Sequence, residues 1–102
     1  MKNLFDIRGR VVVVTGGAGI LGRSICVYLA EQGARVVVLD RDEKAGEELV
    51  GEIRAEGGEA MFLATDVLDR EVLVANREAI LSAYGAIDIL LNAAGGNMGG
   101  AT

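Results

Sequence analysis

The sequence contains no histidine, proline or tryptophan, and it has a single cysteine. Without histidine, the chain can form neither a Cys–His nucleophile pair nor a histidine-containing zinc site. Cys26 cannot form a disulfide within the chain, which fits a protein of a reducing cytoplasm. Because it lies in a predicted helix, we interpret it as a small buried residue rather than a reactive thiol.

Positive charge is also scarce, with 10 lysine and arginine residues against 15 acidic residues and a formal net charge of −5. Such a chain lacks the electrostatic surface that nucleic acids and anionic membranes bind. Long hydrophobic runs are absent too, since the run at 11–14 is far too short to span a bilayer or to form a signal peptide. We therefore expect a cytoplasmic protein with no nucleic-acid or membrane partner.

Glycine, in contrast, is abundant, with 15 residues in a chain of 102. Many of them are concentrated at 16–22 and 95–100, so close approach to the backbone is expected in these two segments. Hydrophobic residues make up 51% of the chain and charged residues 25%, as in globular proteins. A chain of this length forms one compact domain at most.

Short β-branched runs alternate with longer amphipathic stretches along the chain. This alternation predicts a doubly wound α/β fold, because parallel strands are joined by right-handed helical crossovers. Asp42 and Asp69 are expected to cap the second and third helices, and glycines to end all three. The predicted strands are 11–14, 35–39, 60–64 and 87–91, with helices at 20–32, 43–55 and 70–84. We predict a four-stranded Rossmann-like sheet of order 3-2-1-4 with three helices.

The apolar faces of the predicted helices follow from their periodicity. Four-residue spacing places Leu21, Ile25 and Leu29 on the inner face of the first helix. The inner face of the third helix is predicted to contain Val72, Leu73, Ile80 and Ala83.

The segment that follows the first predicted strand contains Gly17-x-Gly19-x-x-Gly22. This spacing matches the fingerprint of dinucleotide-binding loops, in which glycines permit a tight turn and close approach of a pyrophosphate. Backbone N–H groups and the positive end of the following helix then hold the phosphates. An alternative is a P-loop in which Arg23 replaces the usual lysine before Ser24, which would indicate a nucleoside triphosphatase.

Acidic residues follow the next two predicted strands. Asp40 ends the second strand, about twenty residues after the glycines, where a carboxylate accepts hydrogen bonds from the adenosine ribose. Its charge would repel a 2′-phosphate, so we predict NAD rather than NADP, although the neighbouring Arg41 could pair with such a phosphate. Asp66 follows the third strand, at the edge of the sheet where ligands bind, and is interpreted either as a loop residue or as an adenine contact.

Together these motifs resemble the short-chain dehydrogenase/reductase family. The resemblance rests on T-G-G-A-G-I-L-G at 15–22, on Asp40, on Asp66-Val67 and on N-A-A-G at 92–95, and it covers essentially the whole chain. The commonest family spacing would place glycine where this chain has Ile20. Gly19 takes over that role here, as in a subgroup with T-G-G-x-G-x-L-G loops, whose L-N-A-A-G-G-N stretch also resembles 91–97. That subgroup includes sugar-acid oxidoreductases of the mannonate or fructuronate kind.

The resemblance implies an NAD-dependent oxidoreductase that moves hydride between the cofactor and a secondary alcohol or ketone. The subgroup suggests a sugar acid as the substrate. The resemblance also implies that the asparagine segment steadies the sheet and lies against the cofactor ribose, and that the full-length protein is a homo-oligomer. The implied cofactor-binding residues are Gly16, Gly17, Gly19, Ile20, Leu21, Gly22, Asp40, Arg41, Asp66, Val67, Asn92, Ala93, Ala94 and Gly95.

The catalytic Tyr-x-x-x-Lys pair of the family is missing, since Tyr28 is followed by Gln32 and Tyr84 by Asp88. The apolar fourth strand would also be an edge, which soluble monomers normally avoid. We therefore expect residues 1–102 to be a truncated, inactive N-terminal part of a longer catalytic domain, with no catalytic residue or metal site of its own. A competing hypothesis is a nucleotide-binding module without catalysis.

Overall fold

The computed structural model describes residues 6–93, which form seven elements in strictly alternating order. The strands pair in parallel in the order β3-β2-β1-β4, which confirms the predicted topology. The element bounds are β1 (Val11–Thr15), α1 (Ile20–Glu31), β2 (Arg35–Asp40), α2 (Glu43–Ala55), β3 (Glu59–Ala64), α3 (Arg70–Tyr84) and β4 (Ile89–Asn92).

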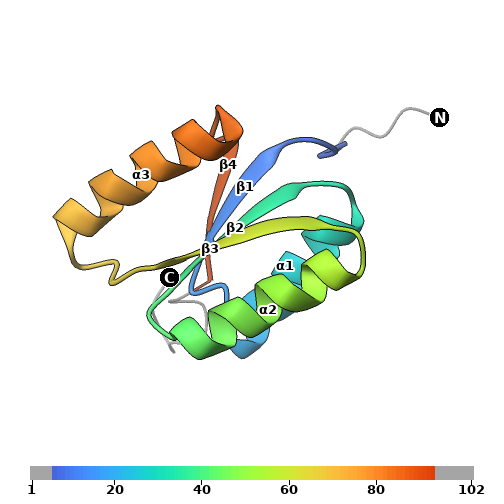
Figure 1. Ribbon diagram of the computed structural model, residues 1–102, viewed down its shortest axis with the longest axis horizontal. Coiled ribbons are helices and arrows are strands. Elements are labelled where there is room, and N and C mark those ends of the chain that lie inside the picture. The colour runs from blue at the N-terminus through green and yellow to red at the C-terminus, as the bar shows by residue number, and fades with distance from the viewer. Residues whose placement is uncertain (1–5, 94–102) are drawn as a thin grey trace.

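The sheet separates two layers of helices, with α1 and α2 on one face and α3 on the other (Figure 1). Because successive side chains of a strand point to opposite faces, the valines of β1 and β2 divide between two cores. Val12, Val14, Val36 and Val38 pack with Cys26 and Leu49 on the α1 and α2 face. Val11, Val13, Val37 and Leu39 pack with Ile80 on the α3 face.

Aspartates and glycines delimit the helices as the sequence predicts. Asp42 accepts a hydrogen bond from the Ala45 N–H at the start of α2, and Asp69 accepts from the Glu71 and Val72 N–H groups at the start of α3. Gly85 ends α3 with φ of 80°, a left-handed conformation that residues with a Cβ rarely adopt. These caps fix where α2 and α3 begin relative to the carboxyl ends of the strands.

The predicted inner face of α1 is partly wrong. Leu21 is 53% exposed, and the buried residues of this helix are Gly22 and Cys26. The reason is the glycine loop: Gly22 lies directly against the backbone of Gly16, which turns the row of Gly22 and Cys26 toward the sheet. Leu21 is therefore left in an open position at the end of the helix.

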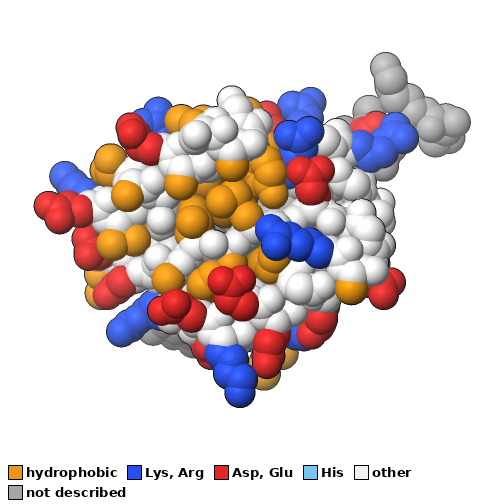
Figure 2. Space-filling view, viewed as in Figure 1, with side chains coloured by type: hydrophobic (Ala, Val, Ile, Leu, Met, Phe, Trp, Pro, Cys, Tyr) orange, Lys and Arg blue, Asp and Glu red, His pale blue; other side chains and the backbone are white. Residues whose placement is uncertain are grey.

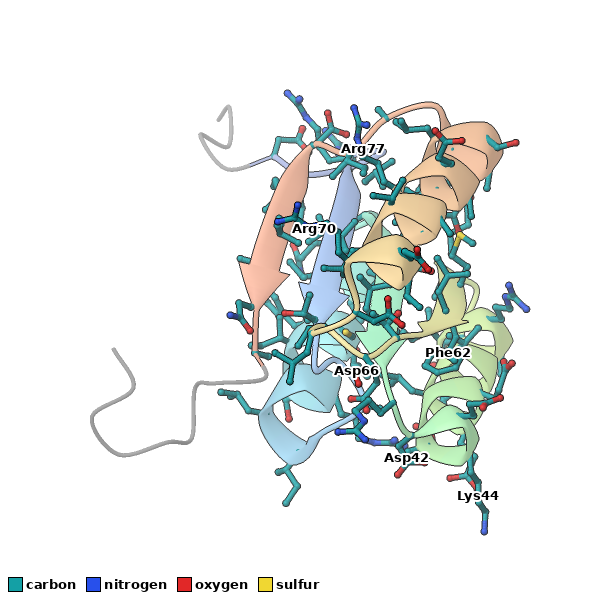
Figure 3. The ribbon with its side chains drawn as sticks, turned by 90° about the vertical axis from the view of Figure 1, so that its left-hand side faces the viewer. Asp42, Lys44, Phe62, Asp66, Arg70 and Arg77 are labelled. Carbon is teal, nitrogen blue, oxygen red and sulfur yellow. The ribbon has the colours of Figure 1, made fainter. Side chains whose placement is uncertain are left out.

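The predicted inner face of α3 is also partly wrong. Ile80 is buried, but Leu73 is 36% exposed and Ala83 is exposed, while the polar Asn76 is buried. Figure 3 looks onto this face of the sheet and shows that α3 lies toward the β3 side, leaving β4 uncovered. The helix therefore covers only part of the sheet, and half of its predicted apolar stripe has nothing to pack against.

An apolar groove of about 670 Å³ results between α3, β1 and β4. Its lining includes Val13, Leu73, Ile80, Ile87 and Leu90, of which Leu90 is 66% exposed. On the opposite side of α3, hydrophobic side chains also gather between this helix and β3 (Figure 2). We call the groove between α3, β1 and β4 the α3–β4 groove.

β4 begins at Ile89, two residues later than the sequence predicts. Asp88 instead joins the start of β4 to β1, because its side chain accepts a hydrogen bond from the Val11 N–H at 2.8 Å and its own N–H donates to the Val11 carbonyl at 2.9 Å. Within residues 6–93, no helix has the length and apolar character needed to cross a membrane.

Candidate cofactor site

A cavity of about 640 Å³ opens at the carboxyl ends of the strands, beside the glycine loop. Its volume is typical of sites for small molecules and cofactors. Of the residues expected to bind a cofactor, the cavity wall contains Gly16, Gly19, Ile20, Leu21, Gly22, Asp40, Arg41, Val67 and Ala93. Segments from β1, β2, β3 and β4 thus meet around one space, as the topology predicts for parallel strands.

The glycines of the loop differ in what they contribute. A Cβ on Gly22 would lie 2.2 Å from the Gly16 carbonyl oxygen, and one on Gly17 would lie 3.0 Å from a Val38 methyl group. Both residues are therefore required for close packing of α1 on the strands. A Cβ on Gly19, in contrast, would meet only the Gly16 oxygen at 3.5 Å. Tight packing therefore does not require glycine at position 19, and Gly19 leaves open space on the cavity side.

The N-terminus of α1 is the one helix start in the described structure without a side-chain cap. Its N-cap is Gly19, which has no side chain to accept a hydrogen bond, and its first turn contains no acidic residue. The first N–H groups of a helix have no acceptor within the helix, and the helix dipole adds positive potential there. Because Gly19, Ile20, Leu21 and Gly22 line the cavity, this positive end faces a space in which an anion such as a pyrophosphate can bind.

Asp40 connects the glycine loop to the start of α2. Its Oδ2 accepts a hydrogen bond from the Ala18 N–H, and its Oδ1 accepts from the Asp42 N–H, both at 3.0 Å. The carboxylate therefore holds the loop in place while it also lines the cavity. Arg41 lines the same wall and is exposed, so the cavity has one anionic and one cationic side chain side by side.

The two residues of the Asp66-Val67 pair occupy different positions. Val67 is 43% exposed and lines the cavity. The Asp66 side chain is outside the cavity lining, and its Oδ1 accepts a hydrogen bond from the Leu68 N–H at 3.0 Å within its own loop. Figure 3 shows Asp66 near the carboxyl ends of the strands, so the residue borders the site without forming its wall.

The asparagine after β4 lies beside the first strand. Thr15 donates a hydrogen bond from Oγ1 to the Asn92 Oδ1 at 2.9 Å, which joins β1 and β4 at the end of the sheet. Asn92 lines the α3–β4 groove rather than the cavity, whereas Ala93 lines the cavity itself. The predicted site residues Ala94 and Gly95 lie outside the described residues.

Sequence reasoning missed three residues of the cavity wall, namely Ser24, Leu39 and Thr65. Two of them could have been found, since Leu39 precedes Asp40 and Thr65 precedes Asp66 at the ends of β2 and β3. Gly17, which is among the residues expected to bind a cofactor, lies against Val38 and Cys26 and outside the cavity wall.

Neither tyrosine belongs to the cavity. Tyr28 is 59% exposed on α1, and Tyr84 packs at the end of α3, where the Arg35 guanidinium lies 5.6 Å from its ring centroid. Partial burial raises the pKa of the Tyr84 hydroxyl, which makes it a poorer proton donor at neutral pH. In residues 6–93, moreover, histidine, cysteine and acidic side chains form no cluster that could hold a metal ion.

Comparison with known proteins identifies short chain dehydrogenases and oxidoreductases as relatives. The family model for short chain dehydrogenase matches residues 10–102. An uncharacterized oxidoreductase, UxuB, of Bacillus subtilis (strain 168) is 44% identical over 92 residues, which are 90% of this chain and 33% of that protein. The chain thus spans about a third of the length of this relative.

Solved structures of the same kind share the fold. A protein assigned as a D-mannonate oxidoreductase of Haemophilus influenza, with bound NAD, gives a TM-score of 0.80 at 29% identity over 83% of this chain and 30% of that one. A metagenomic short-chain oxidoreductase in complex with NADP gives 0.78 at 36% identity over 83% of this chain and 38% of that one. With the family model matching nearly the whole sequence, the chain belongs to the short chain dehydrogenase family.

Proposed function

We propose that this chain binds NAD in the cavity beside the glycine loop, as the cofactor-binding part of an oxidoreductase. One observation carries the proposal: the uncapped N-terminus of α1 opens into a cavity of about 640 Å³ that also contains the Asp40 carboxylate. A dinucleotide has both groups that such a cavity recognises, an anionic pyrophosphate for the helix end and ribose hydroxyls for the carboxylate.

Each part of the cofactor is assigned to residues in or beside the cavity wall by the chemical groups that would meet. Gly16, Gly19, Ile20, Leu21 and Gly22 would hold the pyrophosphate, with Gly17 supporting the loop from below. Asp40 and Arg41 would face the adenosine ribose. Asp66 and Val67 would border the adenine, and the segment Asn92, Ala93, Ala94 and Gly95 would lie against the remaining ribose.

The preference for NAD rests on Asp40. Its carboxylate lines the cavity and would repel the 2′-phosphate of NADP, whereas it can accept hydrogen bonds from free ribose hydroxyls. Arg41 is the opposing influence, because a guanidinium pairs well with phosphate. Solved relatives bind either cofactor, one with NAD and another with NADP. We favour NAD because the two hydrogen bonds to Asp40 hold its carboxylate in the cavity wall.

The activity that we propose for the whole protein is the oxidation of a secondary alcohol or the reduction of a ketone. The nicotinamide ring of the bound cofactor would supply or accept the hydride. The residues described here bind and orient that cofactor, and we assign no catalytic residue to this chain. A sugar acid is the proposed substrate class, because one structural relative is assigned as a D-mannonate oxidoreductase. A cytoplasmic location and a homo-oligomeric full-length protein remain our expectations.

The position of Arg23 argues against the alternative function, a nucleoside triphosphatase. A P-loop needs a cation at this position to reach the β- and γ-phosphates. Arg23 instead forms an ion pair with Glu52 of α2, away from the cavity wall. A nucleotide-binding module without catalysis would use the same cavity, and it differs from the enzyme only in what the rest of the protein contains.

Calorimetric titration of the purified chain tests the proposal, with NADH, NADPH and ATP with magnesium as separate ligands. Saturable binding with NADH preferred is the expected result. Preference for ATP and magnesium would favour the triphosphatase. Absence of NADH binding by a chain that circular dichroism shows to be folded would contradict a competent cofactor site in these residues.

A further inference from the structure

A buried polar pair joins α3 to the cofactor cavity. Asn76 and Thr65 are 8% and 3% exposed, and they are the only buried polar side chains among residues 6–93. The Asn76 Nδ2 donates a hydrogen bond to the Thr65 Oγ1 at 2.7 Å. Such pairing is expected, because an amide or hydroxyl buried without a partner is costly.

The hydrogen bonds of Thr65 leave it little freedom. Its hydroxyl donates its single proton to the Leu63 carbonyl at 2.8 Å, so the oxygen is free to accept from Asn76. Its backbone N–H donates to the Asp40 carbonyl at 2.8 Å. Thr65 is therefore connected to β3, to the residue that ends β2 and to α3, and it lines the cofactor cavity.

Asn76 occupies a position where the helical pattern predicts an apolar residue. An apolar side chain there would fill the α3–β4 groove as well as the amide does, but it could not reach the Thr65 hydroxyl. The rest of α3 gives little support, because Ile80 is its one fully buried hydrophobic side chain. The hydrogen bond from Asn76 thus connects the middle of α3 to Thr65, in addition to the N-cap residue Asp69, whose N–H donates to the Asp66 carbonyl at 2.9 Å.

The segment from Thr65 to Val67 borders both the cofactor cavity and the α3–β4 groove. Val67 and Leu39 line the cofactor cavity and also the α3–β4 groove. A small shift of α3 relative to the sheet would therefore move the cavity wall at Thr65 and Val67. It would leave the glycine loop in place, because that loop is fixed by β1, α1 and Asp40.

We propose that Asn76 is a positioning residue of the cofactor site, which sets the adenine-side wall by holding Thr65. This inference rests on the proposed binding of a dinucleotide. It assigns to α3 a role in cofactor affinity, although no residue of α3 belongs to the cavity wall.

The test is Asn76→Leu, which keeps the outline of a side chain branched at Cγ and removes the amide donor. Three probes are titrated: NADH, ADP and inorganic pyrophosphate. Loss of one hydrogen bond of this kind is worth about a fivefold to tenfold change in affinity. We expect NADH and ADP to weaken by about this factor, while pyrophosphate binding stays as in the wild type. Ile80→Val serves as the control, since it loosens α3 packing without removing the bond.

The outcomes separate the two proposals. If the folded wild-type chain binds no NADH, the proposed function fails and this inference fails with it. If the wild type binds NADH and Asn76→Leu binds it equally well, the positioning role is wrong. Equal weakening of all three probes, or the same selective weakening in Ile80→Val, also overturns it, because either would indicate general loosening.

Should Asn76→Leu fail to fold, the same bond can be tested from Thr65. Thr65→Val removes the hydroxyl at constant shape, and Thr65→Ser keeps the hydroxyl but loses the methyl group. Weaker NADH binding by the valine variant alone supports the proposal. Equal NADH binding by both variants contradicts it.

Discussion

Asp40 combines two roles at the scale of a single residue. Its carboxylate accepts hydrogen bonds from the Ala18 and Asp42 N–H groups, and it lines the cavity where an adenosine ribose would bind. Replacement by alanine would therefore disturb the glycine loop as well as remove the charge. Asparagine keeps the size of the side chain and one acceptor oxygen, so it isolates the effect of the charge better.

We predict that Asp40→Asn reduces the preference for NADH over NADPH by about tenfold, the size expected for losing one charged interaction. Calorimetric titration of both cofactors measures the ratio of the two dissociation constants. Asp42→Asn is the matched control, because this neighbouring carboxylate caps α2 and lies outside the cavity wall. An unchanged ratio in Asp40→Asn would show that the charge of Asp40 does not select the cofactor.

Cys26 is fully buried beneath the glycine loop, with its Sγ 3.8 Å from the Gly17 carbonyl oxygen. Burial raises the pKa of its thiol from 9.0 to about 12. Because the thiolate is the reactive form, we expect labelling by a disulfide reagent at neutral pH to proceed only through opening of the fold. The labelling rate should therefore rise with denaturant. Fast labelling of the native chain would contradict this assignment.

The same pKa shift predicts a pH dependence of stability. A group whose pKa is raised by folding stabilises the fold below its unfolded pKa and loses that contribution as pH rises toward the folded value. The window here runs from about pH 9 to about pH 12. The free energy of unfolding should fall more steeply above pH 9 in the wild type than in Cys26→Ala. Equal slopes would mean that folding does not raise the pKa of the thiol.

At the scale of elements, the packing of α2 on β3 depends on one glycine. A Cβ on Gly46 would lie 2.2 Å from the aromatic ring of Phe62, which is half-buried in the sheet, whereas a Cβ on Gly51 of the same helix would meet no atom within 4 Å. Figure 3 shows Phe62 beside α2. The helix therefore approaches the strand more closely than any other residue at position 46 would allow.

We predict that Gly46→Ala lowers the free energy of unfolding by about 1–3 kcal/mol through overpacking. Gly51→Ala should raise it by about 0.5–1 kcal/mol, because alanine favours a helix and has room there. Denaturant unfolding of both variants provides the measurement. The double variant Gly46→Ala, Phe62→Leu should recover part of the loss. Equal effects of the two alanines would indicate helix propensity alone, with no close contact.

At the scale of the whole molecule, the two edges of the sheet differ. β3 begins with the exposed Glu59, paired to Arg35, and the Arg54 side chain bonds the Ala60 carbonyl. β4 has no charged residue, its Leu90 is 66% exposed, and the α3–β4 groove lies beside it. An apolar, uncharged edge strand next to an apolar groove favours association between copies.

We therefore predict that the purified chain associates with itself in a concentration-dependent way. Sedimentation velocity measures the distribution of species, and Leu90→Lys should shift it toward monomer by placing a charge in the groove. Leu68→Lys is the control, since Leu68 is 89% exposed in the loop before α3 and lies outside the groove. A wild-type chain that stays monomeric at high concentration would contradict the prediction.

The sequence by itself determined the elements, their order and the family. Buried parallel strands appear as uninterrupted valine runs, aspartates and glycines mark the helix ends, and the glycine spacing leaves few alternatives for the loop after β1. These signals are local, so they can be interpreted before any contact is known. The carboxyl-end position of Asp40, Asp66 and Asn92 also followed from topology alone.

Only the tertiary structure decided which faces are buried and which side chains meet. Gly22 rather than Leu21 faces the sheet because of its contact with the Gly16 backbone, and Asn76 is buried because Thr65 offers it a partner across eleven residues. The Asp66 carboxylate accepts a hydrogen bond within its own loop, while Val67 is part of the cavity wall. Such outcomes depend on contacts that the helices make with strands and loops in space, and helical periodicity carries no information about those contacts.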